Sequence, residues 1–177
     1  IRPLSRDDAP TYRDLRLRML REHPEAFTSS YEEDSQKPLS WVEARLTPTP
    51  QSPHNFVLGA FSDDGALVGS VGLAVEERMK QRHKALVFGM FVAPEAGGRG
   101  IGRALLDACI ARARSIPGLE LLNLTVTATN ERSCRLYATA GFRTMAIEER
   151  AIRVNGVYYP KAHMVLELRP PTGGIAG

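Results

Sequence analysis

The feature that most constrains the fold of this chain is a glycine-rich turn between two apolar segments. Four of the six residues from 97 to 102 are glycine. They follow an apolar stretch, Ala85–Val92, and precede an amphipathic segment that extends to Ser115. The first pattern predicts a strand and the second a helix. Glycine lets backbone N–H groups approach a ligand closely, and the helix dipole adds partial positive charge. The turn therefore predicts a site for a phosphate or pyrophosphate group.

Two common nucleotide-binding motifs do not fit this turn. A dinucleotide fingerprint has the pattern G-x-G-x-x-G, and counting from Gly98 and Gly100 its third glycine falls on Arg103. A P-loop needs Lys and then Ser or Thr after its last glycine, but Arg103 and Ala104 follow Gly102. The spacing therefore excludes both of these nucleotide sites.

The turn resembles the acetyl-CoA signature of the GCN5-related N-acetyltransferase (GNAT) superfamily, Q/R-x-x-G-x-G/A after a strand that ends in V-x-P. Gly100 and Gly102 match its glycines, whereas Gly97 stands where the family usually has Gln or Arg. A second segment, Asn130–Phe142, resembles the family's N-x-x-A-x-x-L-Y-x-x-x-G-F, with Ser133 in the place of the alanine. Both motifs occur in the expected order and about thirty residues apart, which makes the resemblance specific. As an order of strands and helices it extends over roughly residues 54 to 168, and the motifs themselves fix some twenty of those positions.

The resemblance implies that acetyl-CoA is the cofactor and that both motifs hold it. The implied cofactor-binding residues are Phe91, Val92, Gly97, Gly98, Arg99, Gly100, Ile101, Gly102, Arg103, Asn130, Ser133 and Tyr137. Backbone groups at Phe91 and Val92 would bind the pantetheine arm, and an amide of that strand would polarise the thioester carbonyl. Gly89 either marks a bulge that opens the strand or only relieves packing. Four arginines in or beside the motifs could surround the CoA phosphates, namely Arg99, Arg103, Arg132 and Arg135.

Tyr137 is the residue that we expect to act as the general acid. A phenol with a pKa near 10 can protonate a thiolate whose conjugate acid has a pKa near 8.5, so the phenol only has to reach it. The residues alone also allow a simpler role, as a core aromatic one turn before the helix end. Asn130 has a local role as the helix N-cap, which is compatible with a contact to the cofactor.

The general base is the open question of this sequence. An ammonium group must lose a proton before it attacks, and the strand Ala85–Val92 contains no carboxylate. Glu77, at the end of the preceding strand, is the base that we expect. The alternatives are proton removal through water and four other side chains, Glu76, His83, Glu32 and Glu33.

The acceptor site is implied by the family and not by any motif of its own. In this superfamily the region between the first two helices usually forms one wall of that site. Phe27, Tyr31 and Glu32 are therefore the expected acceptor contacts, although the acidic stretch also fits a helix N-terminus with no further role. Tyr158 and Tyr159 could line the mouth of the site.

The remaining segments predict an α/β fold with the element order β-α-α-β-β-β-α-β-α-β-β and a mostly antiparallel central sheet flanked by helices, which is also the order of the family. Strands are predicted at residues 1–4, 55–61, 66–75, 85–92, 119–127, 146–154 and 157–168. Besides the helix that ends at Ser115, one is predicted to end before Pro24, one to run from Pro38 to Leu46, and one from Asn130 to Gly141. Asp64-Gly65 and Asn155-Gly156 predict hairpin turns, and the near-continuous apolar strand at 119–127 predicts a partly parallel neighbour.

The length of 177 residues suits one domain, expected at residues 1–168. Residues 169–177 are rich in Pro and Gly and are expected to be a disordered tail. Cys109 and Cys134 fall inside predicted helices, so both are expected to be packing residues, and no Cys and His spacing indicates a metal site. No signal-peptide pattern and no apolar run of membrane-spanning length occur, so we expect a cytoplasmic protein with no membrane partner.

Three classes of function fit these observations to different degrees. The leading hypothesis is an N-acetyltransferase that moves an acetyl group from acetyl-CoA to a primary amine of a small molecule or protein, by direct attack in a ternary complex. The alternative is a non-catalytic acyl-CoA-binding module, which would not need Tyr137. A nucleic-acid-binding domain is disfavoured, because the net charge of +3 comes from scattered residues without interleaved aromatics. The oligomeric state stays open, with a homodimer among the alternatives.

Overall fold

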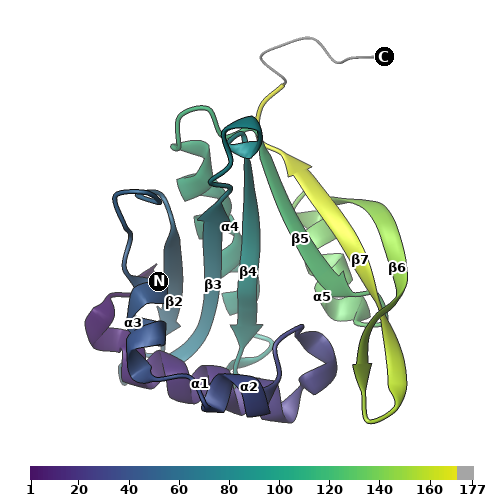
Figure 1. Cartoon of the computed structure of the whole chain (residues 1–177). Helices are drawn as coiled ribbons and strands as arrows, with labels where there is room; N and C mark the ends of the chain where they lie inside the picture. Colours follow the sequence, from purple (N-terminus) through teal and green to yellow (C-terminus); the bar gives the residue numbers. More distant parts are fainter. Residues whose placement is uncertain (171–177) are drawn as a thin grey trace.

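Seven strands form one sheet in the order β1-β2-β3-β4-β5-β7-β6 (Figure 1). Every neighbouring pair is antiparallel except β4 and β5, which are parallel. This computed structural model describes residues 1–170. The strands are β1 (Arg2–Pro3), β2 (Phe56–Phe61), β3 (Leu67–Val75), β4 (Lys84–Val92), β5 (Leu121–Thr127), β6 (Arg143–Val154) and β7 (Val157–Glu167). The expected α/β fold with a mostly antiparallel sheet is confirmed.

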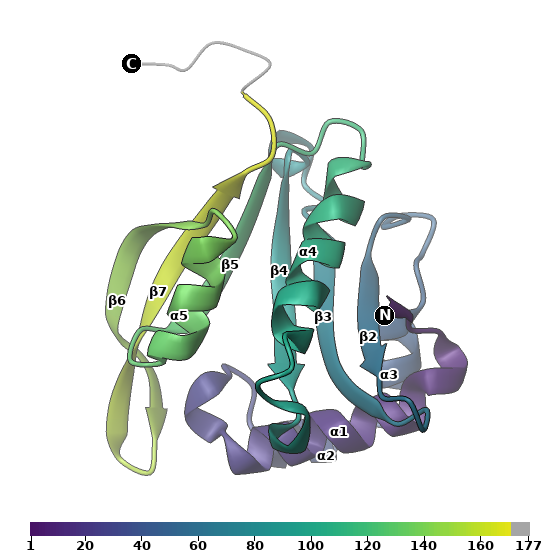
Figure 2. The ribbon, with the colours of Figure 1, turned by 180° about the vertical axis from the view of Figure 1, so that it is seen from behind.

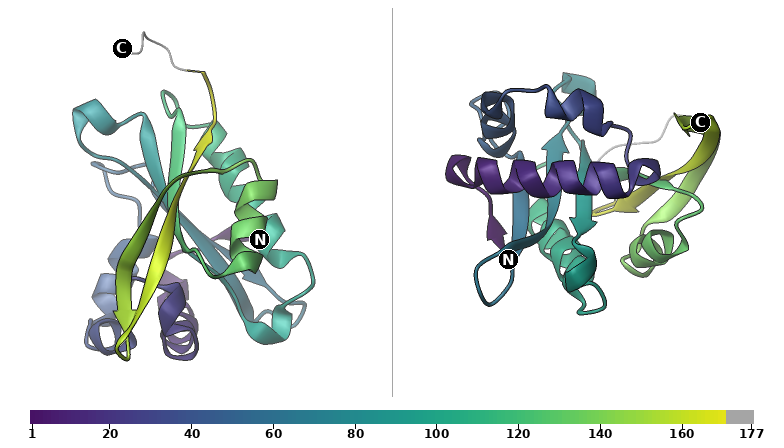
Figure 3. Two further views of the ribbon diagram at one scale, coloured as in Figure 1. Left: turned by 90° about the vertical axis from the view of Figure 1, so that its right-hand side faces the viewer. Right: turned by 90° about the horizontal axis from the view of Figure 1, so that it is seen from below.

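Helices cover both faces of the sheet. On one face lie α1 (Ala9–Glu22), α2 (Tyr31–Ser35) and α3 (Leu39–Leu46) (Figure 1), and on the other lie α4 (Ile101–Arg114) and α5 (Glu131–Thr139) (Figure 2). Figure 3 shows α1 crossing one end of the sheet. Four 3₁₀ turns complete the order: η1 (Arg6–Asp8), η2 (Pro24–Ala26), η3 (Met79–Gln81) and η4 (Pro94–Ala96). No helix among the described residues is long and apolar enough to span a membrane.

Each layer of helices encloses its own apolar core. Leu105, Leu106 and Cys109 of α4 are fully buried against the sheet. On the other face, Tyr12 of α1 is fully buried and its ring stacks on Phe91 of β4 at a centroid distance of 6.5 Å. The two cores fix β4 from both sides, so the end of this strand has a defined position for the site that follows it.

β4 and β5 pair only over their first three residues, Lys84–Leu86 with Leu121–Asn123. Beyond Leu86 the two strands diverge, which opens the sheet in its middle (Figure 1). The partly parallel neighbour that the sequence predicts for the apolar strand at 119–127 is therefore β4. The divergence leaves the far half of β4 without a strand on that side.

The divergent half of β4 also contains a bulge at Gly89. Ser70 of β3 pairs with Phe91 and Gly72 pairs with Phe88, so β4 has one residue more than β3 in this interval. Gly89 has a φ of +57°, and its carbonyl accepts a hydrogen bond of 2.9 Å from the Ser70 hydroxyl. Of the two interpretations of Gly89, the structure supports the bulge.

The structure differs most from the sequence prediction in two places. Residues 31–35 form the separate helix α2, which begins at Ser30 as its N-cap. β6 begins at Arg143, three residues before the predicted start at 146. Most of β6 is exposed, and an edge strand that faces solvent does not need an alternating apolar pattern.

Both predicted hairpin turns are present. Gly65, Asn155 and Gly156 all adopt positive φ, as such tight turns require. At the end of the chain, Arg169 donates a hydrogen bond to the carbonyl of Arg114. The rest of the predicted tail, residues 171–177, lies outside the described part of the chain.

Candidate active site

A cavity of about 540 Å³ lies where β4 and β5 diverge, and we call it the turn cavity because the glycine-rich turn forms one of its walls. The end of β4, the start of α4, η2 and α5 form the remainder. The predicted residues that line it are Phe27, Phe91, Val92, Gly97, Gly98, Gly100, Ile101, Gly102, Arg103, Asn130, Ser133 and Tyr137. The structure therefore brings together the two motifs that are about thirty residues apart in the sequence. Arg99 is the one predicted cofactor-binding residue that does not line the cavity.

The backbone of the turn requires glycine at two positions. Gly98 and Gly100 both have a φ of +77°, and Gly100 is the N-cap of α4. A Cβ atom built at either position would meet no atom within 4 Å, so the space above the turn is open. The first amides of α4 have no intrahelical partner and face this end of the helix. Open space beside free N–H groups at a helix N-terminus fits the phosphates of a nucleotide cofactor.

Two of the four arginines near the motifs line the turn cavity, Arg103 and Arg132. Arg103 is held by Asp107 one turn further along α4, at 2.8 Å. Arg135 points elsewhere on α5 and contacts Glu131 at 3.6 Å. Arg132 has no carboxylate partner among the described residues, so it is the guanidinium most available to an anionic ligand in this cavity.

Tyr137 is almost completely buried, with 6% of its surface exposed. Its ring packs edge-on against Phe142 at a centroid distance of 5.9 Å. Within residues 1–170 its hydroxyl has no hydrogen-bond partner, and the residue lines the turn cavity. Burial raises the pKa of this phenol above its usual value, and the nearby Cys134 and Cys109 thiols add to the effect. The phenol therefore keeps its proton at neutral pH, as a general acid must.

The side chain of Asn130 acts as the N-cap of α5. Its Oδ1 atom accepts a hydrogen bond of 3.0 Å from the backbone N–H of Ser133. This is the local role that the sequence predicts for Asn130. Both residues line the turn cavity, so the cap also fixes the start of α5 beside the glycine turn.

Two titratable residues of the turn cavity were not predicted from the sequence, His23 and Glu25. Glu25 lies within η2 and His23 is the N-cap of η2, and the His23 Nδ1 atom lies 3.9 Å from the Glu25 Oε1 atom. In the sequence, Pro24 indicates only that α1 ends there. Nothing nearby in the chain indicates that this segment reaches the sheet.

A buried lysine holds η2 against the sheet. The Lys161 Nζ atom of β7 donates to the carbonyl of Ala26 and to the hydroxyl of Thr127, both at 2.9 Å. Thr127 of β5 in turn donates to the carbonyl of Glu25 at 2.6 Å. Lys161 is 4% exposed, and burial lowers its pKa. These contacts determine where the His23 and Glu25 side chains lie.

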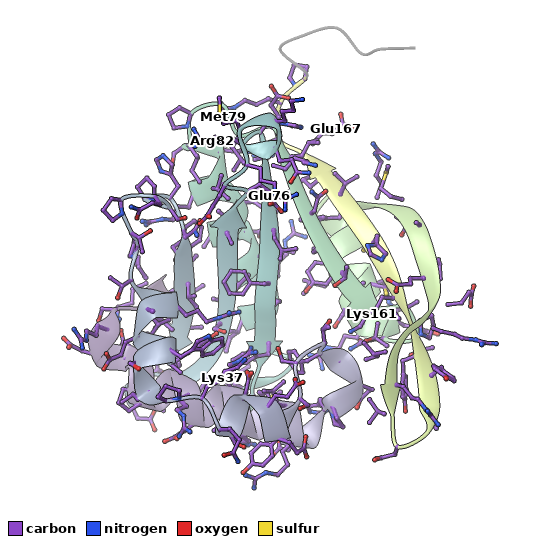
Figure 4. The ribbon with its side chains drawn as sticks, viewed as in Figure 1. Lys37, Glu76, Met79, Arg82, Lys161 and Glu167 are labelled. Carbon is purple, nitrogen blue, oxygen red and sulfur yellow. The ribbon has the colours of Figure 1, made fainter. Side chains whose placement is uncertain are left out.

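The structure does not bring Glu77 to the turn cavity. Glu77 accepts a hydrogen bond of 2.6 Å from Ser52, and the neighbouring Glu76 N–H donates to the carbonyl of Lys84 at the start of β4. The cavity lies at the other end of β4, eight residues away at about 3.3 Å each, or about 26 Å. Glu76 and Lys161 mark these two ends of the sheet in Figure 4. His83, which precedes β4, lies at the far end as well.

A second cavity of about 480 Å³ lies between the segment that joins α1 to α2 and the β6–β7 hairpin. We call it the hairpin cavity. The expected acceptor contacts Phe27, Tyr31 and Glu32 all line it, together with Ile152–Asn155 of the hairpin. Phe27 also lines the turn cavity, so the two cavities meet at this side chain. Neither Tyr158 nor Tyr159 lines either cavity.

The cavities contain no group of three His, Cys, Asp or Glu side chains that could hold a metal ion, nor does any other part of residues 1–170. Cys109 is buried and Cys134 is partly buried, and both are free thiols.

Comparison with known proteins gives consistent matches. The model of the acetyltransferase (GNAT) family matches residues 15–142. N-alpha-acetyltransferase RimI of Mycobacterium tuberculosis is 34% identical over 116 residues, which cover 66% of this chain and 70% of that protein. Mycothiol acetyltransferase of Propionibacterium freudenreichii is 38% identical over 93 residues, which cover 52% of this chain but only 29% of that protein.

A solved structure shares the fold. The Salmonella typhimurium protein YncA, whose structure was determined with its cofactor acetyl-CoA, aligns with a TM-score of 0.78. The alignment covers 99% of this chain and 97% of that one, at 22% sequence identity. This similarity shows a common fold over almost the whole of both chains.

Proposed function

The chain belongs to the acetyltransferase (GNAT) family, and we propose that it transfers an acetyl group from acetyl-CoA to a primary amine of a small molecule or protein. The observation that carries this proposal is that the glycine turn, the bulged strand β4 and Tyr137 surround one cavity. The matched relatives are named as acetyltransferases, which supports the same class of reaction. Direct attack by the amine in a ternary complex needs both substrates side by side, and the two adjoining cavities offer that arrangement.

The donor would lie in the turn cavity. Its pyrophosphate would meet the amides at Gly98–Gly102 and the guanidinium of Arg132. Its pantetheine arm would lie along β4 beside Phe91 and Val92, because β4 has no strand on its β5 side there and the backbone groups of that side can bind an extended chain. Acetyl-CoA supplies an acyl group that is activated as a thioester.

The bulge at Gly89 would contribute to the polarisation of the thioester carbonyl. A bulge changes the direction of the amides that follow it, and Ser70 fixes this one by its bond to the Gly89 carbonyl. An amide directed at the carbonyl oxygen would stabilise the negative charge that develops there during attack. Tyr137 would then protonate the departing thiolate from the same cavity.

The amine must lose a proton before it attacks. Because Glu77 lies at the other end of the sheet, we assign this step to η2 and its N-cap, where Glu25 and His23 line the turn cavity. Either side chain could accept the proton directly or through water. The acceptor itself would occupy the hairpin cavity beside Phe27, Tyr31 and Glu32.

The alternative of a non-catalytic acyl-CoA-binding module is not favoured. Such a module would need the glycine turn but not a buried, protonated tyrosine beside it. The first experiment is to measure acetyl-CoA binding by calorimetry and the release of free thiol with a panel of amines, amino acids, polyamines and peptides. Turnover with an amine supports the enzyme, binding without any turnover supports the module, and absence of binding contradicts both.

A further inference from the structure

The hairpin cavity contains more positive than negative charge. Three charged side chains line it: Arg21 at the end of α1, Arg153 on β6, and Glu32 at the start of α2. The two arginines come from segments more than a hundred residues apart in the sequence. A cavity of about 480 Å³ has the size of a small-molecule site. Its charge therefore bears on which small molecules it accepts.

Both arginines stack on tyrosine rings, and neither pairs with a carboxylate. The Arg21 guanidinium lies 4.4 Å from the centre of the Tyr31 ring and donates a hydrogen bond of 2.8 Å to the Tyr31 hydroxyl. The Arg153 guanidinium lies 5.4 Å from the centre of the Tyr158 ring. Neither arginine has a carboxylate within ion-pair distance in the described part of the chain.

Seven other arginines of the described residues do contact a carboxylate. Arg16 pairs with Asp34 at 2.7 Å, and Arg18 pairs with Glu95 at 2.6 Å. Five others also contact a carboxylate, namely Arg2, Arg6, Arg103, Arg135 and Arg143. Arg21 and Arg153 have no such partner, and both line one cavity, so their charge is available to a ligand there.

A guanidinium stacked on a ring keeps most of its hydrogen-bonding capacity. Arginine has five N–H donors, and Arg21 uses one of them toward Tyr31. The ring fixes the plane of the guanidinium, so little side-chain freedom is lost when it binds a ligand. A carboxylate matches such a planar pair of donors, because it can accept two parallel hydrogen bonds.

We propose that the acceptor is a small-molecule amine that also carries an acid group, and that Arg21 and Arg153 bind this group. The inference depends on the proposed function, because it places the amine beside Phe27, where the hairpin cavity meets the turn cavity. The acid group then lies in the hairpin cavity and directs the amine toward the acetyl group. Amino acids are the simplest compounds of this class.

Glu32 provides a further test, because its carboxylate lines the same cavity and would repel the acid group of the ligand. Neutralising it by Glu32→Gln should therefore strengthen the binding of an acidic acceptor. If the cavity instead selected a polyamine, Glu32 would be the attractive group and the same substitution would weaken binding. The two classes of acceptor thus predict opposite signs for one substitution.

The test compares acceptors that differ only in the acid group. Each α- or ω-amino acid is paired with its carboxamide, which has nearly the same shape but no charge, at equal concentrations of neutral amine. Thiol release should give a value of kcat/KM roughly tenfold to hundredfold higher for the acid, mainly through a lower KM. Arg21→Gln and Arg153→Gln should each reduce that ratio, whereas Glu32→Gln should increase it.

Arg150 provides the matched control. Its guanidinium lies 5.5 Å from the centre of the same Tyr158 ring, but it does not line the hairpin cavity. Arg150→Gln removes the same charge from the same hairpin and should leave the ratio unchanged. An equal effect of Arg150→Gln and Arg153→Gln would show a general electrostatic effect and would overturn the assignment.

Further outcomes separate this inference from the proposed function. Equal or faster turnover of the carboxamides would overturn the inference and leave the acetyltransferase intact; it would point to a peptide N-terminus. Where no panel member turns over, binding of N-acetylated amino acids by calorimetry is the second measurement. If Arg153→Gln weakens that binding, the inference stands. If no acidic compound binds while acetyl-CoA does, the inference is wrong. Loss of acetyl-CoA binding itself would contradict the proposed function.

Discussion

The guanidinium of Arg132 lies directly beside Gly97. A Cβ atom built on Gly97 would be 3.8 Å from the Arg132 Nη2 atom and 3.9 Å from its Nη1 atom. Gly97 occupies the position where related sequences usually have Gln or Arg, so the chain lacks a polar side chain there. The structure places a cation from α5 at the same point of the turn cavity. Arg132 can therefore replace the missing contact to a cofactor phosphate.

We expect Arg132→Gln to weaken acetyl-CoA binding by about tenfold, because one charge-assisted hydrogen bond is lost. Arg135→Gln is the control, since Arg135 lies on the same helix but contacts Glu131 and does not line the cavity. Calorimetric titration measures both. Gly97 has a φ of −64°, which any residue can adopt, but a Cβ atom there would lie 3.0 Å from the Pro94 carbonyl oxygen, so the turn must shift by a few tenths of an ångström. With that shift, Gly97→Gln in the Arg132→Gln background should restore part of the affinity. Equal losses in the two arginine variants would contradict this role.

Gly100→Ala should affect both stability and cofactor binding. A residue other than glycine at a φ of +77° costs about 1–2 kcal/mol, and the added methyl group would enter the turn cavity. Gly118→Ala is the matched variant, because Gly118 has a φ of +72° but lies after α4, away from the cavity. Urea unfolding should show similar destabilisation of the two variants. Only Gly100→Ala should bind acetyl-CoA more weakly.

Tyr137→Phe should reduce kcat by about a hundredfold or more and leave acetyl-CoA affinity nearly unchanged, as expected when a general acid is lost. The substitution removes no hydrogen bond within the described residues, so the fold should tolerate it. Burial raises the pKa of the phenol, which stays protonated up to higher pH than a free tyrosine. The wild type should therefore show no loss of activity from this group between pH 6 and about 10. A kcat close to that of the wild type would remove Tyr137 from the mechanism.

Lys161 should make part of the stability depend on pH. Burial lowers its pKa in the folded protein, so between that lowered value and about 10.4 the unfolded chain binds more protons than the folded chain. Stability from this group therefore rises as the pH rises through that interval. Lys161→Met should remove this slope, which urea unfolding at several pH values would measure. The variant also loses both hydrogen bonds that hold η2 and Thr127, so KM for the acceptor should rise.

Local signals in the sequence predicted most of the fold. Asp64-Gly65 and Asn155-Gly156 favour tight turns by backbone conformation alone, and both turns are present. The bulge at Gly89 was one of two interpretations, because a glycine in a strand does not reveal whether its partner strand has one residue fewer. Only the register of β3 with β4 decides between them.

The site was harder to predict than the fold. Glu77 follows β3 and precedes β4, and since these strands are antiparallel neighbours, their connection lies at the end of the sheet opposite Val92. The order of the strands alone therefore places Glu77 far from the end of β4 that precedes the glycine turn. The position of η2 was not available from the sequence, because Lys161 holds Ala26 across 135 residues of sequence. Side-chain contacts over such distances leave no local pattern.

The short pairing of β4 with β5 has a consequence for motion. Three residue pairs connect these strands, and beyond Leu86 the β5 side of β4 lacks a ladder of backbone hydrogen bonds. Unpaired amides of this kind exchange with solvent through small local openings that do not require unfolding. A bound pantetheine arm would occupy the same backbone groups and slow their exchange. The far half of β4 would then open together with the rest of the sheet, and not on its own, only when the cofactor is bound.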